Sequence, residues 1–164
     1  MSDSPVQPPG CTNFRLRQLL RAVARHYDAE LGTVGLKGTQ YSLLSHVIGL
    51  EPVQPVELAR RMGLDASTLT RNLRVLTAHG WVTQGPGDDA RSRLVEATAA
   101  GRAKHAEARR SWKKAQLSLA ERLGADQVAA LHALIDHGLQ RLDDDGGEAP
   151  TALRAAPSGA GSRR

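Results

Sequence analysis

The pattern of apolar and polar positions is most informative between residues 55 and 76, which read PVELARRMGLDASTLTRNLRVL. On a helix, where successive residues are about 100° apart, Leu69, Leu73 and Leu76 fall on one face. The opposite face carries hydroxyl and guanidinium groups, on Ser67, Thr68, Thr70, Arg71 and Arg74. The stretch therefore predicts an amphipathic helix with one buried and one exposed face.

A shorter helix precedes it and completes a helix-turn-helix pattern. Pro55 suits the first position of that helix because its missing N–H would be unpaired there. Gly63 ends the helix as a residue free to adopt positive φ, and Asp65 is placed to cap the next one. The exposed hydroxyls and guanidiniums form a donor set that contacts phosphates and base edges in a DNA major groove. The alternative is an ordinary helical hairpin with a solvated polar face.

Apolar residues at helical spacing predict four further helices, two before this stretch and two after it. The first begins at Thr12 or Asn13 and ends before Gly32. We expect Thr39 to cap the second, Thr98 to cap a long helix, and a last helix to follow it. Their ranges are 12–31, 39–48 (closed by Pro52), 98–123 and 126–142.

Between residues 81 and 96 the apolar period shortens and predicts two strands. Residues 81–84 and 93–96 flank the sequence GPGDDARS, whose Gly-Pro-Gly marks a turn. A hairpin directly after a recognition helix is a wing. The predicted fold class is mainly α with a small β-hairpin wing, a winged helix-turn-helix plus a helical dimerisation region.

The apolar stripes of the first, fifth and sixth predicted helices exceed what a small winged core covers. Terminal helices with a surplus apolar face commonly bury it against a second copy of the chain. We therefore expect a homodimer; the alternative is an extended monomeric bundle.

Composition narrows the possible partners. A net charge of +5 and a pI near 10.0 fit a nucleic-acid partner without establishing one. Five aromatic residues are too few for a base-stacking platform, and one cysteine excludes an internal disulfide framework. No apolar run approaches a membrane span and the N-terminus lacks a signal-peptide core, so we expect a cytoplasmic protein with no membrane partner.

Three motifs resemble the MarR family of bacterial transcriptional regulators. They are GLKGTQYSLL at 35–44, ELARRMGLDASTLTRNLRVLTAHGWV at 57–82 and DARSRLVEATAAG at 89–101. The last is the most specific, because it resembles the family's wing signature of Asp-x-Arg, a strand and Thr-x-x-Gly. The similar architecture spans residues 12–142, with a winged helix-turn-helix at about 39–97 and dimerisation helices at about 12–34 and 98–142. Residues 1–11 and 143–164 are expected to be disordered tails.

This resemblance implies a homodimer whose two lobes read a pseudo-palindromic operator in double-stranded DNA, usually as a repressor. It implies that the polar face of the recognition helix enters the major groove and that Arg91, oriented by Asp89, enters the minor groove. A narrow A·T minor groove has a negative potential that attracts arginine. The complete set of expected DNA contacts is Ser67, Thr68, Thr70, Arg71, Arg74, Asp89, Arg91 and Arg93.

A small-molecule effector is expected between the dimerisation helices and a winged lobe, where it would change the spacing of the lobes. The polar and aromatic candidates on the bordering helices are Arg25, His26, Tyr41, His46 and Trp112. Arg25 or a protonated histidine would meet a carboxylate and Tyr41 or Trp112 would cover a ring, which favours an aromatic carboxylate. The alternative is that both aromatic residues are core packing and Arg25 is a surface residue.

Cys11 lies just before the first predicted helix, whose N-terminus favours a thiolate. In the peroxide-sensing branch of the family a reactive cysteine occurs near this helix start, but alignment on Tyr27 and Gln40-Tyr41 puts its counterpart at Asn13. A redox-responsive regulator of the same fold using Cys11 is the alternative function; a merely unpaired thiol is the simpler interpretation.

The remaining polar residues form no pattern typical of an enzyme. The six histidines show no multi-ligand spacing, and Ser42, Ser45 and His46 lack a nucleophile elbow and a carboxylate partner. We therefore expect no catalysis, no metal and no cofactor. The hypotheses from other functional classes are an enzyme and a DNA-architectural protein. A regulator would differ from both by protecting one short palindromic DNA sequence without turning over a substrate.

Overall fold

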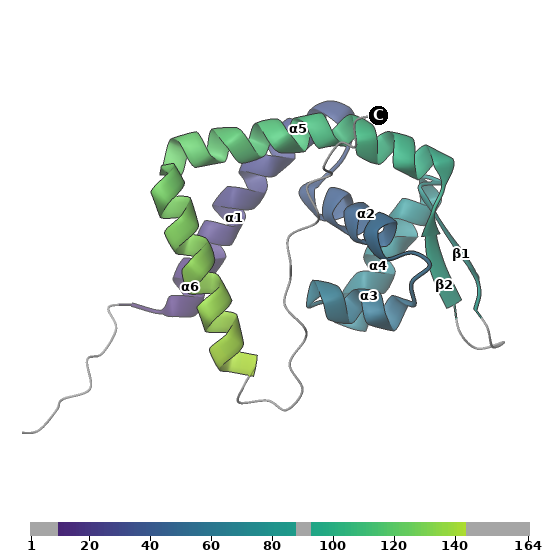
Figure 1. Cartoon of the computed structure of the whole chain (residues 1–164), viewed down its shortest axis with the longest axis horizontal. Helices are drawn as coiled ribbons and strands as arrows, with labels where there is room; N and C mark the ends of the chain where they lie inside the picture. The colour runs from purple at the N-terminus through teal and green to yellow at the C-terminus, as the bar shows by residue number, and fades with distance from the viewer. Residues whose placement is uncertain (1–9, 88–92, 144–164) are drawn as a thin grey trace, which may run out of the picture.

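The computed structural model describes residues 10–87 and 93–143. Within these ranges the chain is mainly helical, with one two-stranded antiparallel hairpin (Figure 1). In chain order the elements are α1 (Thr12–Leu31), the 3₁₀ turn η1 (Gly32–Val34), α2 (Gly38–Leu50), α3 (Pro55–Met62), α4 (Ala66–Ala78), β1 (Val82–Pro86), β2 (Arg93–Ala97), α5 (Ala99–Leu123) and α6 (Ala125–Asp143). The predicted fold class is therefore confirmed.

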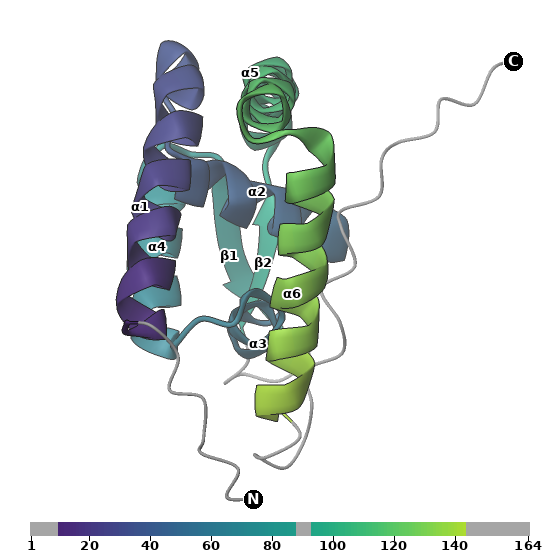
Figure 2. The ribbon, with the colours of Figure 1, turned by 90° about the vertical axis from the view of Figure 1, so that its left-hand side faces the viewer.

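The long helix α5 joins two groups of elements. At its N-terminal end lie α2, α3, α4 and the hairpin, which together form the winged lobe; α6 turns away at its other end (Figure 1). Helix α1 packs along α5. In the view turned by 90°, α1 and α6 stand on opposite sides, and α5, seen end-on, lies above α6 and beside the upper end of α1 (Figure 2).

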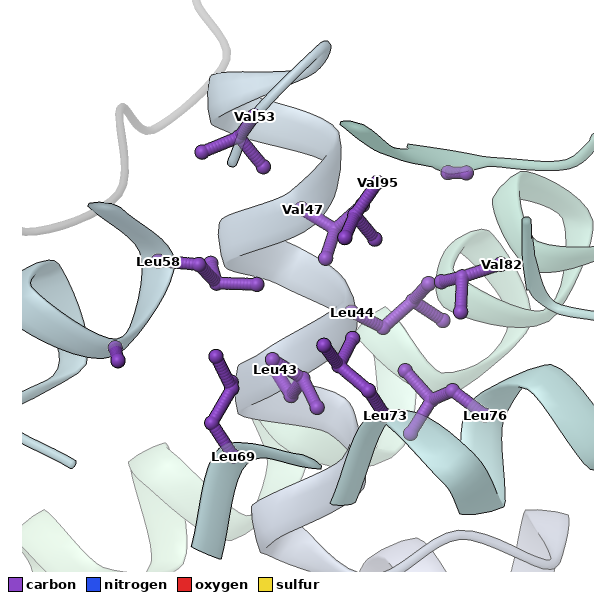
Figure 3. Close-up of a cluster of buried hydrophobic side chains, with 12 residues drawn as sticks. Leu43, Leu44, Val47, Val53, Leu58, Leu69, Leu73, Leu76, Val82 and Val95 are labelled. Carbon is purple, nitrogen blue, oxygen red and sulfur yellow. The ribbon is translucent and has the colours of Figure 1, made fainter. Parts of the chain in front are cut away.

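The winged lobe is held together by one apolar core. Leu43, Leu44 and Val47 of α2 lie at its centre, and Leu58 of α3 packs against them (Figure 3). The predicted buried face of α4 enters the same core: Leu69, Leu73 and Leu76 are each at most 3 % exposed. Val82 and Val95 close the core from the hairpin. Burying each such side chain contributes about 1.5–3 kcal/mol, so this core fixes how α4 is presented.

A second cluster joins α1, α2 and α5. Leu31, Leu36, Tyr41 and Ala108 are buried together, with Trp81 packed against them. Because α5 carries a small residue, Ala108, at this point, α1 and α2 can approach it closely. The second cluster therefore links the winged lobe to α1.

The hairpin pairs in a simple register, from Val82 opposite Ala97 to Pro86 opposite Arg93. Val53, in the segment between α2 and α3, adds an isolated antiparallel bridge to Val95. The wing is thus tied by its backbone to the segment that precedes the helix-turn-helix.

The expected start of α2 is wrong. Thr39 does not cap α2, which begins one residue earlier; Asp28 of α1 accepts a hydrogen bond from Gly38 N at 2.7 Å instead, and Gln40 accepts one from Lys37 N at 2.8 Å. The expected end of α1 is confirmed: the helix ends at Leu31, Gly32 begins η1, and the chain turns at Gly35, whose φ is 71°. The acceptor at the start of α2 is thus a carboxylate of α1, and the spacing of residues near Thr39 does not reveal it.

The apolar stripes of α1 and α6 are only partly covered in the single chain. Leu20 of α1 is 68 % exposed and Leu142 of α6 is 75 % exposed. Further exposed apolar side chains on these two helices are Phe14, Leu16, Leu134, Ile135 and Leu139. In the described part of the chain, no helix is long and apolar enough to cross a membrane.

Candidate nucleic-acid interface

The turn between α3 and α4 has the geometry expected of a helix-turn-helix. Pro55 occupies the first turn of α3, and Gly63 ends that helix with φ 60°, a conformation that costs glycine little. Asp65 then caps α4 by accepting a hydrogen bond from Thr68 N at 2.8 Å. The sequence prediction for this turn is confirmed.

The face of α4 opposite the core is polar and open to solvent. Arg71 and Arg74 are exposed, as are Ser67 and Thr70, while Thr68 is half-buried. These five side chains point away from the core because Leu69, Leu73 and Leu76 occupy the opposite face. The exposed arginines can reach phosphates or guanine edges, which accept two parallel hydrogen bonds from a guanidinium.

The hydroxyl groups of α4 are already engaged within the helix. Ser67 Oγ donates to Asp65 Oδ1 at 2.5 Å, and Thr68 Oγ1 donates to Asp65 Oδ2 at 2.7 Å. Thr70 Oγ1 donates to the carbonyl oxygen of Ala66 at 2.7 Å. The hydrogen bonds from Ser67 and Thr68 hold the pKa of Asp65 well below its usual range. We expected these hydroxyls as donors towards DNA; in this geometry their protons are used inside the protein.

Helix α3 contributes two arginines that the sequence analysis did not single out. Glu57 accepts hydrogen bonds from Arg60, at 2.8 and 2.9 Å, and from Arg61 Nε at 2.7 Å. The same bonds lower the pKa of Glu57 to about 2. The spacing i, i+3 and i, i+4 was the signal that could have revealed this pairing.

The wing begins directly behind the recognition helix. Thr77 of α4 accepts a hydrogen bond from Gln84 Nε2 of β1 at 3.5 Å, and Arg93 lies exposed at the start of β2. Asp89 and Arg91, expected at the wing tip, lie outside the described residues. The part of the wing that is described carries one of the three expected wing contacts.

Glu51 connects the wing to the long helix. Its Oε2 accepts a hydrogen bond from Ala97 N at the end of β2, at 2.6 Å, and its Oε1 lies 2.5 Å from Arg102 Nη2 of α5. The carboxylate is only 12 % exposed. The end of α2, the base of the wing and the start of α5 are thus held at one point.

Comparison with known proteins agrees with this geometry. Residues 34–92 match the MarR family profile. A mutant of MarR from E. coli, complexed with operator DNA, has a similar structure with a TM-score of 0.72 and 26 % identity over 77 % of this chain and 92 % of that one. The M. tuberculosis transcriptional regulator MOSR, in complex with DNA, is 32 % identical with a TM-score of 0.65, over 78 % of this chain and 98 % of that one. An uncharacterized HTH-type transcriptional regulator of Bacillus subtilis, YwoH, is 29 % identical over 57 % of this chain and 68 % of its own length.

The chain belongs to the MarR family. It is a DNA-binding transcriptional regulator, and members of this family are not enzymes.

The structure of this MarR-family chain brings two of the expected effector residues together. Tyr41 stacks on Trp112, with ring centroids 5.9 Å apart, and also on His105, at 5.1 Å with an angle of 6° between the rings. Burial raises the pKa of Tyr41. Burial also lowers the pKa of His105, and the positive charge of Arg109 lowers it further. His105 was not among the expected site residues, because nothing in the local sequence shows that it faces Tyr41.

The other three expected effector residues lie apart from this stack. His46 Nδ1 is hydrogen-bonded to the carbonyl oxygen of Ser42 in its own helix, at 2.8 Å. His26 Nε2 lies 2.9 Å from the carbonyl oxygen of Ala115, in the contact between α1 and α5. Arg25 is exposed on α1. A hollow of about 410 Å³ on α5 is lined by His105, Ala106, Arg109, Arg110 and Lys113.

Cys11 precedes the first residue of α1 and is exposed. Its role in redox sensing stays a prediction. Among the described residues, no group of three or more His, Cys, Asp or Glu side chains is arranged to hold a metal ion.

Proposed function

We propose that this MarR-family regulator is a homodimeric repressor that binds a pseudo-palindromic operator and is released by a small aromatic carboxylate. The observation that carries the proposal is the exposed polar face of α4, held on a buried apolar face and flanked by the wing. An α-helix of this kind fits the major groove, and two copies related by a two-fold axis fit half-sites one helical turn apart.

In this proposal the recognition helix and the wing divide the contacts. Arg71 and Arg74 donate to base edges or phosphates, and Ser67, Thr68 and Thr70 line the groove beside them. Arg93 lies near the DNA backbone, and Arg91, oriented by Asp89, enters the adjacent minor groove. The related complexes of E. coli MarR with operator DNA and of MOSR with DNA support this use of the fold.

Dimerisation is supported by the uncovered apolar faces of α1 and α6. A helical interface shared by two subunits would bury exposed apolar side chains such as Leu20, Leu134 and Leu142. The winged helix-turn-helix at about 39–97 would then be the DNA-reading part, and residues 12–34 and 98–142 the dimerisation part.

The stack of Tyr41, His105 and Trp112 supports an effector site between α2 and α5. An aromatic acid would pack its ring on this edge and meet positive charge from Arg109 or Lys113, which line the adjacent hollow. Bound there, the acid would release DNA only if it binds more tightly to the dimer in which the winged lobes are too far apart or too close for the operator than to the dimer that fits the operator. Arg25, His26 and His46 remain as outer candidates.

Footprinting on the DNA next to the gene tests the proposal. We expect one protected palindrome made of two half-sites. Protection should be lost when salicylate-like or nicotinate-like acids are added. A Trp112→Ala variant should keep the footprint and lose the response to acid. Protection without symmetry would contradict the dimeric operator, and a wild-type footprint indifferent to every acid would contradict the effector.

A further inference from the structure

The hydroxyl protons at the start of the recognition helix point inwards. Ser67 Oγ and Thr68 Oγ1 each lie within 2.7 Å of an oxygen of the Asp65 carboxylate, and Thr70 Oγ1 lies 2.7 Å from the carbonyl oxygen of Ala66. A carbonyl oxygen never donates. The carboxylate stays ionised because these same hydrogen bonds lower the pKa of Asp65, so it cannot donate either. Each hydroxyl must therefore be the donor.

A hydroxyl group has one proton and two lone pairs. With the proton committed, only acceptor sites remain on its outer side. In the major groove, phosphate oxygens, guanine N7 and O6 and thymine O4 are acceptors and gain nothing from such a group. The groups that do pair with it are the amino groups of adenine (N6) and cytosine (N4).

We propose that Asp65 is a positioning residue for sequence specificity: by holding the protons of Ser67 and Thr68, it makes the start of α4 a reader of adenine and cytosine amino groups. This inference rests on the proposed entry of α4 into the major groove. Donation to phosphates and guanine is then left to Arg71 and Arg74, which are exposed further along the helix and have no acceptor atoms.

Asp65→Asn separates this role from capping. Thr68 N–H needs an acceptor, so the amide oxygen takes the place of Oδ1 and the amide NH₂ takes the place of Oδ2, facing Thr68 Oγ1. Thr68 must then accept from the NH₂, and its own proton turns outwards. The helix cap survives while one hydroxyl changes from acceptor to donor. Thr70 is the internal control, because its proton is held by Ala66 and not by Asp65.

The test is selection of binding sites from randomised duplex DNA with the full chain, followed by affinities of the enriched sites. We expect the wild type to favour adenine or cytosine at the position facing Thr68, by about 2- to 12-fold, the range of one neutral hydrogen bond. Asp65→Asn should move that preference to guanine or thymine and leave the position facing Thr70 unchanged. Loss of the negative charge should raise affinity for all duplexes alike, which cancels in the preference.

Thr68→Val, with nearly the same shape and no hydroxyl, keeps the proposal testable if Asp65→Asn folds poorly. It should abolish the preference at this position in the wild type, and in combination with Asp65→Asn no reversal should appear. An Asp65→Asn variant with an unchanged base profile, or a Thr68→Val variant with a full preference, overturns the inference. A wild-type protein that enriches no sequence overturns it together with the proposed function, whereas a wild-type motif weakened by Arg71→Ala supports that function in either case.

Discussion

Gly101 lies so close to Trp81 that a Cβ atom added to it would be 1.9 Å from the Trp81 carbonyl oxygen. The contact joins the first turn of α5 to the residue before β1. Thr98, between β2 and α5, completes the junction: its Oγ1 accepts from Gly101 N at 3.0 Å and donates to the Gly80 carbonyl oxygen at 2.6 Å. The Thr-x-x-Gly of the wing motif thus binds the exit of the recognition helix to α5.

Replacing Gly101 should damage this junction. In Gly101→Ala the new methyl group meets backbone that cannot rotate away, so we expect a loss of at least about 3 kcal/mol in the free energy of unfolding, at the upper end of overpacking costs. Gly49→Ala is the control, since Gly49 lies in α2 with nothing within 4 Å of its added Cβ. Urea denaturation followed by circular dichroism measures both. Equal urea midpoints for the two variants would show that the backbone around Gly101 and Trp81 shifts to accommodate the methyl group at little cost in stability.

A charge on the apolar stripe of α6 tests dimerisation. Ile135 is 43 % exposed in the single chain, so Ile135→Asp should leave each subunit folded while placing an unpaired charge in a shared interface. Sedimentation of Ile135→Asp should show monomers. The same variant should bind operator DNA more weakly than the wild type. Ala133→Asp adds the same charge on the opposite face of α6 and should remain dimeric. If Ile135→Asp stays dimeric at micromolar concentration, the subunits meet through another surface.

The sequence predicted the elements whose signals are local. The caps at Asp65 and Thr98, the turn at Gly63 and the buried face of α4 all follow from residues within one or two turns of each other, and the structure confirms them. The cap of α2 by Asp28 was missed because it joins residues ten positions apart in different helices.

The sites that depend on tertiary contacts were predicted less completely. His105 reaches Tyr41 across 64 positions of sequence, and only the packing of α5 on α2 reveals the stack. Similarly, the residue types of Ser67 and Thr68 were recognised but not the direction of their hydroxyl protons. That direction follows from distances to Asp65, which a pattern of spacing does not contain.

Arg71 should carry a large share of operator affinity. If it makes a bidentate contact with a guanine, Arg71→Ala costs about 1–3 kcal/mol, or roughly 5- to 150-fold in the dissociation constant, at the native operator. Arg17→Ala removes another exposed arginine, on α1, and serves as the control for net charge. Fluorescence anisotropy at a fixed salt concentration gives both constants. Equal affinities for the two variants would remove Arg71 from the interface.

Glu51 provides a graded test of how the wing is anchored. Glu51→Gln keeps an acceptor for Ala97 N–H and loses the ion pair with half-exposed Arg102, so we expect a cost below about 1 kcal/mol that shrinks in high salt. Glu51→Ala also leaves that N–H without its partner and should cost about 1–3 kcal/mol. Urea midpoints at low and high salt measure the loss of stability in each variant. A larger loss in Glu51→Gln than in Glu51→Ala would contradict the prediction.

The final prediction concerns pH and the contact between α2 and α5. His105 Nε2 lies 2.9 Å from Ser45 Oγ, the ring stacks on Tyr41, and burial together with Arg109 lowers the pKa of His105. In the unfolded chain a histidine takes up a proton near pH 6.5. As the pH falls below that value the unfolded state binds a proton that the folded state resists, so this contribution to stability is complete at higher pH and is lost on acidification.

The variant His105→Gln should therefore lose less stability than the wild type between pH 7.5 and pH 5.5, because glutamine keeps an N–H donor near Ser45 and does not titrate. His137→Gln, exposed on α6, removes a histidine remote from this contact and should follow the wild type. Urea midpoints at the two pH values give the comparison. If His105→Gln and the wild type lose the same amount of stability, protonation of His105 does not cause the loss on acidification, and the contact between α2 and α5 tolerates a charged imidazole.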